Sequence, residues 1–262
     1  MKILAIGDIF GKTGRQIIKN YLSQLKKEYQ IDLVVANVEN ATHGKGISFQ
    51  HYQELEKCGI EIMTSGNHVF DLEETQKDIN KFSKLIRPLN SNPYHEGKGS
   101  IITEWKNKKV RITNLIGRTF MPPAENPYFV LEKVLEKDNS DIHLVDFHAE
   151  ATAEKIAFAW YFVGKITALW GTHTHVQTAD ERILADKTAF ITDLGMTGPS
   201  EGIIGAKREA IIRRAKDGLP AKIIPHEDKE NKGQFNGIII EIDDNTNKVI
   251  NIQRINLKNL KW

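Results

Sequence analysis

Three apolar runs early in the chain each lead through a polar loop into a segment with the spacing of an amphipathic helix. The runs are residues 2–6, 31–37 and 60–64, and the helices are expected over 14–29, from Ser48 to Gly59, and over 71–82. Repeated strand–helix units favour parallel pairing of neighbouring strands, whose carboxyl ends then meet at one edge of a sheet. This feature predicts an α/β fold in which ligands bind where the strands end.

The rest of the chain mixes hairpins with further strand–helix units. Alternating apolar and polar residues predict two hairpins, one pairing 101–105 with 110–115 and one pairing 237–242 with 248–255. Strands are expected at 142–147, 165–170 and 188–192, helices at 128–136, 149–162 and 206–216, and a glycine-rich loop at 193–205. No repeat, low-complexity segment or linker divides the sequence, so we expect one domain over residues 1–262.

Composition argues against several classes of function. The 262 residues include 36 basic and 34 acidic side chains, so the formal net charge is only +2 and does not favour nucleic acid or an anionic membrane. The apolar runs are too short for a signal peptide or a membrane span, so we expect a soluble, cytoplasmic protein. The single cysteine, Cys58, lies in an amphipathic segment and is expected to be a small buried side chain.

Polar side chains follow several of the expected strands. They are Asp8 after the first strand, Glu39 and Asn40 after the second, Asn67 and His68 after the third, and His148, His173 and His175 after two later strands. Taken singly, each has an ordinary structural explanation, such as a helix N-cap, a turn or a polar strand end. All of them fall at the same edge of the expected sheet, and this convergence predicts a functional site.

Carboxylate, amide and imidazole groups in one cluster indicate a metal site. These donors, with no thiolate nearby in the sequence, suit iron, manganese or zinc better than copper or an iron–sulfur cluster. The number of candidate ligands favours two ions over one, roughly 3.5–4 Å apart as in two-metal hydrolytic sites. Glu39 is the candidate bridge between the ions, because its loop lies between the other two early loops in the sequence.

Several short motifs surround these residues. Gly7-Asp8, Gly66-Asn67-His68, a histidine after a strand and the segment Gly171-Thr172-His173-Thr174-His175 resemble the motifs of the calcineurin-like metallophosphoesterases. Four strings are similar to the bacterial YmdB-like branch: Gly-Asp-Ile-Phe-Gly-Lys at 7–12, Val-Glu-Asn-Ala at 38–41, Asp-Phe-His-Ala-Glu-Ala-Thr at 146–152 and Gly-Met-Thr-Gly-Pro at 195–199. The resemblance spans nearly the whole chain and implies an α/β/β/α four-layer sandwich.

Two departures from the wider superfamily affect the ligand set. Its usual Asp-x-His motif is here Asp8-Ile9-Phe10, which lacks the histidine, and its usual Gly-Asp motif is replaced by Glu39-Asn40. Resemblance to the YmdB-like branch implies one ion held by Asp8, Glu39, Asn40 and His175, and a second held by Glu39, Asn67, His148 and His173. The implied metal is iron, with manganese as a substitute, and His68 is the implied general acid.

Phosphoester hydrolysis is the reaction that this ligand set indicates. Two cations activate water near neutral pH and offset phosphoryl charge, while an imidazole protonates the leaving oxygen. The resemblance implies 2′,3′-cyclic nucleotides as small-molecule substrates of a phosphodiesterase, with no stable nucleic-acid complex; a homo-oligomer is compatible with the sequence. A phosphomonoesterase with the same centre, or a non-catalytic metal-binding regulatory protein, stays an alternative.

Other candidate features have no clear place in this constellation. The loops around Lys45 and at 195–202 either contact substrate or simply connect elements. The remaining histidines, which we expect to be ordinary structural or surface residues, are His43, His51, His95, His143 and His226.

Overall fold

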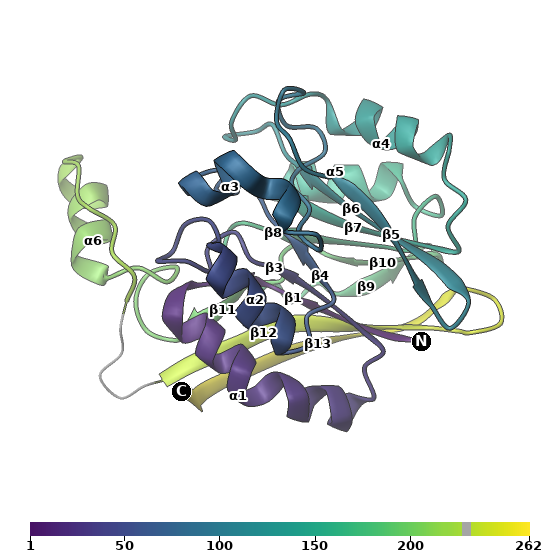
Figure 1. The fold of residues 1–262 in the computed structure, drawn as a ribbon, viewed down its shortest axis with the longest axis horizontal. Coiled ribbons are helices and arrows are strands. Elements are labelled where there is room, and N and C mark those ends of the chain that lie inside the picture. The colour runs from purple at the N-terminus through teal and green to yellow at the C-terminus, as the bar shows by residue number, and fades with distance from the viewer. Residues whose placement is uncertain (227–231) are drawn as a thin grey trace.

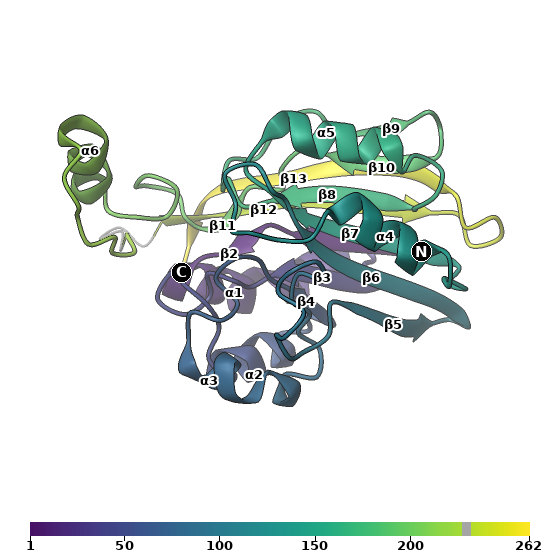
Figure 2. The same ribbon diagram turned by 90° about the horizontal axis from the view of Figure 1, so that it is seen from above.

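Two β-sheets pack face to face, and helices cover the outer face of each sheet (Figure 2). The computed structural model describes residues 1–226 and 232–262 of the chain. Its four layers are the α/β/β/α sandwich that the sequence resemblance implies.

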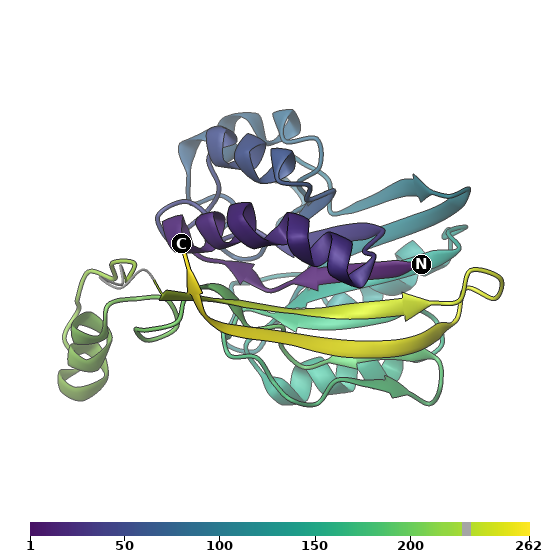
Figure 3. The same ribbon diagram turned by 90° about the horizontal axis from the view of Figure 1, so that it is seen from below.

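The first sheet has the strand order β2-β11-β12-β1-β3-β4, with β13 paired to β12. Its strands are β1 (Lys2–Ile6), β2 (Asp8–Ile9), β3 (Leu33–Asn37), β4 (Ile62–Thr64), β11 (Met196–Pro199), β12 (Lys232–Ile242) and β13 (Val249–Lys261). β1, β3 and β4 are parallel, as the strand–helix repeat predicts. β12 runs antiparallel to β1 and forms the predicted C-terminal hairpin with β13, drawn in yellow beside β1 in Figure 3.

The second sheet has the order β5-β6-β7-β8-β10-β9. Its strands are β5 (Ser100–Trp105), β6 (Lys108–Ile116), β7 (Ile142–His148), β8 (Ala168–Thr172), β9 (Arg182–Leu184) and β10 (Thr188–Ile191). β5 and β6 form the predicted antiparallel hairpin, and β6, β7, β8 and β10 are parallel. The sequence did not predict β9, or β11 in the first sheet, which lies inside the expected glycine-rich loop.

Six helices lie in the described part of the chain. They are α1 (Gly11–Tyr29), α2 (Phe49–Lys57), α3 (Glu73–Asp78), α4 (Pro127–Leu135), α5 (Thr152–Tyr161) and α6 (Arg208–Asp217). Ser48 caps α2 as predicted, because its side chain accepts a hydrogen bond from the His51 amide. The helix expected over 71–82 is shorter, since α3 gives way to a 3₁₀ turn at Ile79–Lys81. Among residues 1–226 and 232–262, none of these helices has the length and apolarity to cross a membrane.

Alternate residues of each strand fill different layers of the core. In β1, Leu4 packs toward α1 and α2, whereas Ile3 packs between the two sheets. In β7, Leu144 packs between the sheets and Phe147 packs toward α4 and α5. Both faces of these strands are therefore buried, which explains why they appear in the sequence as continuous apolar runs. Cys58, expected to be buried, is only partly so and packs beside α2.

Helix α6 projects from the sandwich together with the segments that flank it (Figure 1). It has no buried residue, and Ile212 on this helix is 52% exposed. We call residues 203–226 the arm. The base of the arm is ordered by two backbone hydrogen bonds, from the Lys207 amide to the Ile224 carbonyl and from the His226 amide to the Gly205 carbonyl.

Candidate metal centre

The predicted site residues converge where strands of both sheets end. Asp8 follows β1, Glu39 and Asn40 follow β3, Asn67 and His68 follow β4, His148 ends β7, and His173 and His175 follow β8. The sequence predicted a single sheet edge. The structure instead brings together the corresponding edges of two packed sheets, which places donor groups on opposite sides of one site.

One donor group surrounds the ring of His148. Its Nε2 atom lies 3.1 Å from Glu39 Oε1, 3.1 Å from Asn67 Oδ1 and 3.1 Å from His173 Nδ1. A single ring nitrogen cannot satisfy three such neighbours, whereas a cation placed among them can. Gly66 makes this approach possible, because a Cβ there would lie 2.2 Å from Glu39 Oε2 and 2.3 Å from His148 Nε2.

A second donor group surrounds His175. Its Nε2 atom lies 3.1 Å from Asn40 Oδ1 and 3.9 Å from Asp8 Oδ1. Asp8 is fully buried, and its Oδ1 has no hydrogen-bond partner among the described residues. Burying a carboxylate oxygen without a hydrogen-bond partner costs folding free energy. Asp8 Oδ1 and the neighbouring donor atoms of Asn40 and His175 therefore suit a bound cation.

The two groups adjoin each other. Asp8 Oδ2 accepts a hydrogen bond of 3.3 Å from the backbone amide of His173, which belongs to the first group. Burial raises the pKa of Asp8 to about 6, and among its charged neighbours the Glu39 carboxylate adds to that rise. The Glu39 carboxylate of the first group is thus near enough to Asp8 of the second to affect its protonation, and the bridging role of Glu39 stays a prediction.

In His175 and His148, the outer ring nitrogen fixes which ring atom faces the site. His175 Nδ1 lies 2.9 Å from the Ile204 carbonyl oxygen and so carries the proton, which leaves Nε2 to face Asn40. His148 Nδ1 lies 2.9 Å from Thr172 Oγ1, and that hydroxyl donates to Asp146 Oδ1 at 2.7 Å. Because the hydroxyl proton is committed to Asp146, Thr172 accepts from His148 Nδ1, which leaves Nε2 as the ring atom that faces the site.

Asp146 and Thr172, which support this site, were not predicted from the sequence. Asp146 is fully buried and also accepts hydrogen bonds from the Thr64 hydroxyl and from Asn37 Nδ2, the latter at 3.3 Å. Asp146 stands two residues before His148 on the same strand, so both side chains project from the same face. That two-residue spacing was the signal available in the sequence.

A buried ion pair holds the turn between His173 and His175. Lys155 Nζ, from α5, lies 2.6 Å from Asp193 Oδ2, and both side chains are 1% exposed. The same carboxylate oxygen accepts a hydrogen bond of 3.2 Å from the backbone amide of Thr174. The two histidines have φ angles of 106° and 65°, which non-glycine residues rarely adopt without support from their surroundings.

Comparisons with known proteins identify the family of this chain. The sequence model of the YmdB-like protein family matches residues 4–255. The chain belongs to the YmdB-like family. It is 42% identical over 257 residues to the 2′,3′-cyclic-nucleotide 2′-phosphodiesterase of Bacillus subtilis (strain 168), covering 97% of this chain and 96% of that protein. This YmdB-like chain is accordingly a hydrolase.

Two solved structures share the fold of this YmdB-like chain over its whole length. A structure described as a novel phosphatase, from Mycoplasma pneumoniae, has a TM-score of 0.94 at 42% identity, covering 100% of this chain and 94% of that one. A protein from Thermus thermophilus has a TM-score of 0.93 at 33% identity, covering 99% of this chain and 100% of that one.

Opposite charges stabilise each other inside the first donor group of the YmdB-like chain. Burial alone would raise the pKa of Glu39, but the adjacent His148 ring and the His68 amide outweigh it and lower the pKa. Burial would likewise lower the pKa of His148, but the Glu39 carboxylate raises it. The pKa of His173 falls to about 3 through burial and the positive charge of His148.

His68 stands at the rim of the site rather than inside a donor group. Its backbone amide donates to Glu39 Oε2 at 3.1 Å, which ties its position to the candidate bridge. Its Nδ1 lies 2.8 Å from Asp71 Oδ2, and Lys45 Nζ lies 3.7 Å from the same oxygen. From the sequence, Asp71 is expected only to begin a helix, so its contact with His68 was not predicted.

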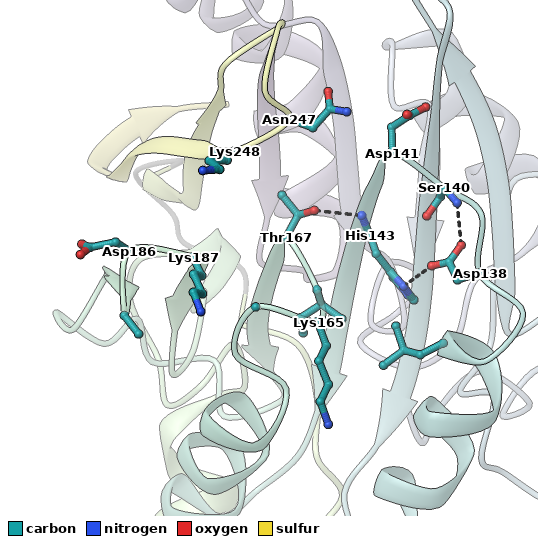
Figure 4. A pocket seen from close by; sticks show the side chains of 14 residues that line it. Asp138, Ser140, Asp141, His143, Lys165, Thr167, Asp186, Lys187, Asn247 and Lys248 are labelled. Atoms are coloured by element: carbon teal, nitrogen blue, oxygen red, sulfur yellow. Dashed lines mark hydrogen bonds and ion pairs between the residues drawn. The ribbon is translucent and has the colours of Figure 1, made fainter.

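His143 lies at the other end of the strands, in a cavity of about 570 Å³ (Figure 4). The side chain is buried, with Nδ1 2.7 Å from Asp138 Oδ2 and Nε2 2.8 Å from Thr113 Oγ1. The lysines that line this cavity, Lys165 and Lys187 among them, do not converge on a common point in Figure 4. His143 thus fits the structural role expected for it.

Proposed function

We propose that this chain is a two-metal phosphodiesterase that hydrolyses 2′,3′-cyclic nucleotides. The observation that carries the proposal is the division of His173 and His175 between two adjoining donor groups, and Glu39 is the proposed bridge between them. The identity to the Bacillus subtilis phosphodiesterase supports the choice of substrate.

The proposed ligands are Asp8, Glu39, Asn40 and His175 for one ion, and Glu39, Asn67, His148 and His173 for the other. Oxygen and imidazole nitrogen donors suit iron, with manganese as the alternative. Such ions, when bound, supply a water of lowered pKa and offset the negative charge of a phosphoryl group.

His68 is the proposed general acid. Asp71 accepts a hydrogen bond from Nδ1 and so holds the ring with Nε2 as the nitrogen that exchanges a proton. Hydrolysis of a cyclic phosphodiester adds water at phosphorus and breaks one bond to a sugar oxygen. That oxygen leaves as a hydroxyl after it receives the proton from His68.

Residues outside the two donor groups hold the proposed ligands in position without contacting the substrate. The chain of hydrogen bonds from His148 through Thr172 to Asp146 fixes the ring orientation of His148. The Lys155–Asp193 ion pair holds the Thr174 amide and thereby the spacing of His173 and His175.

A substrate panel tests the proposal. Protein loaded with iron or manganese is assayed with 2′,3′-cAMP, 3′,5′-cAMP, bis(p-nitrophenyl) phosphate and p-nitrophenyl phosphate. We expect the highest kcat/KM for 2′,3′-cAMP. Faster turnover of the monoester would favour a phosphomonoesterase, and loaded protein without any hydrolysis would favour a regulatory metal-binding protein.

A further inference from the structure

An apolar slot opens beside the second donor group, that of His175 and Asn40. We propose that this slot holds the heterocyclic base of a nucleotide whose phosphodiester lies at the donor groups, an inference that rests on the proposed function. The slot has a volume of about 170 Å³, and its apolar side chains include Phe10, Ile204, Ile223 and Pro225. We call it the base slot.

The base slot is continuous with the candidate metal centre. Asn40, His68 and His175 line it together with the apolar side chains. A group in the slot is therefore within reach of the proposed general acid and of two proposed metal ligands, Asn40 and His175. An occupant of this place is most simply another part of the molecule that reacts there.

Phe10 forms a fixed floor for the slot. Its ring meets the His175 ring edge to face, with centroids 5.5 Å apart. Gly44 and Gly205 pack on the ring so closely that a Cβ would lie 2.9 Å and 2.8 Å from its atoms, respectively.

The base of the arm forms the facing wall. Ile204 has a φ angle of 45°, a costly conformation for a β-branched residue, and its carbonyl oxygen accepts the hydrogen bond from His175 Nδ1. Its side chain is 50% exposed, and that of Ile223 is 44% exposed. The strained backbone thus holds apolar surface in contact with solvent beside a proposed metal ligand, where strain commonly marks function.

The size and chemistry of the slot suit a nucleobase. Pockets that bury a whole drug-sized ligand measure about 300–1,000 Å³, so the slot accommodates only part of a nucleotide. A base offers two apolar faces that stack on aromatic and apolar side chains, and this tolerates different base identities. The charged phosphodiester remains outside, at the donor groups.

The test compares two cyclic phosphodiesters that differ only in the base. The substrates are 2′,3′-cAMP and methyl β-D-ribofuranoside 2,3-cyclic phosphate, and kcat and KM are measured for the wild type, Ile223→Ser and Ile212→Ser. Ile212 serves as the matched control because it is an exposed isoleucine of the arm that does not line the slot.

We expect the wild type to prefer 2′,3′-cAMP. In Ile223→Ser, the ratio of the two kcat/KM values should fall by about 5- to 100-fold, mainly through a higher KM for 2′,3′-cAMP, because a base contributes uniform binding energy. Ile212→Ser should keep the wild-type ratio. Equal kcat/KM values for both substrates in the wild type, or an unchanged ratio in Ile223→Ser, would overturn the proposal that the slot binds the base. Either result would leave the proposed phosphodiesterase function standing. Wild-type protein that hydrolyses neither substrate would overturn the proposed function as well.

Discussion

His173 and His175 are two residues apart but face different partners: His173 Nδ1 lies 3.1 Å from His148 Nε2, and His175 Nε2 lies 3.1 Å from Asn40 Oδ1. In a regular strand, side chains two residues apart project from the same face. The positive φ angles of both histidines break that regularity. The turn therefore lets one short segment serve both donor groups.

Thr172→Val should weaken metal binding while leaving every proposed ligand in place. Valine cannot accept the hydrogen bond from His148 Nδ1, so the ring loses the contact that fixes its orientation. Loss of such a supporting contact typically lowers metal affinity about 10- to 100-fold. Competition with a chelator measures this affinity, and a wild-type value in the variant would exclude the orienting role.

His68→Ala should separate proton transfer from metal binding. His68 stands outside both donor groups, so we expect metal content equal to that of the wild type. Turnover of 2′,3′-cAMP should fall by about 10²- to 10⁴-fold, the usual contribution of a positioned general acid. Loss of metal from this variant would show that His68 supports the ions instead.

Lys155→Met should destabilise the fold strongly. The variant leaves Asp193 buried without its cation, and breaking a buried pair in this way costs about 3–5 kcal/mol. Urea unfolding measures the change in the free energy of unfolding. The double variant Lys155→Met/Asp193→Asn should recover part of that loss, since it no longer buries an unpaired charge. Equal stability of the single variant and the wild type would contradict the prediction.

Proton uptake by His143 should lower the free energy of unfolding in mild acid. Burial lowers the pKa of His143 to about 4, whereas an unfolded chain has the ordinary value near 6.5. The unfolded state therefore binds more protons between pH 6.5 and 4, and lowering the pH through this window favours unfolding. The shift corresponds to about 3 kcal/mol. In His143→Gln, the free energy of unfolding should lose this part of its pH dependence; an identical slope in both proteins would refute the assignment.

Short-range patterns predicted most of the fold. The apolar runs that became β1, β3 and β7 are buried on both faces, and the hairpin β5–β6 joins strands that are adjacent in sequence. β11 was not predicted because its pairing with Asp8–Ile9 joins segments almost two hundred residues apart. The partition of the strands into two sheets came from the family resemblance rather than from periodicity.

The candidate site, like the fold, could be predicted from the sequence only in part. The position after a strand identified Asp8, Glu39 and His148, because the ends of parallel strands meet. The Lys155–Asp193 pair could not be found in this way, since a helix and a distant strand end provide its two members. The roles of the individual ligands stay predictions until the metal content of variants is measured.

Elemental analysis of the wild type and Glu39→Gln, both purified without added metal, tests the central claim most directly. We expect two ions per chain in the wild type. We also expect Glu39→Gln to weaken both ions together, because an amide replaces the charged carboxylate of the proposed bridge. Two tightly held ions in Glu39→Gln would contradict the bridge, and a wild-type protein with fewer than two ions would contradict the two-metal site itself.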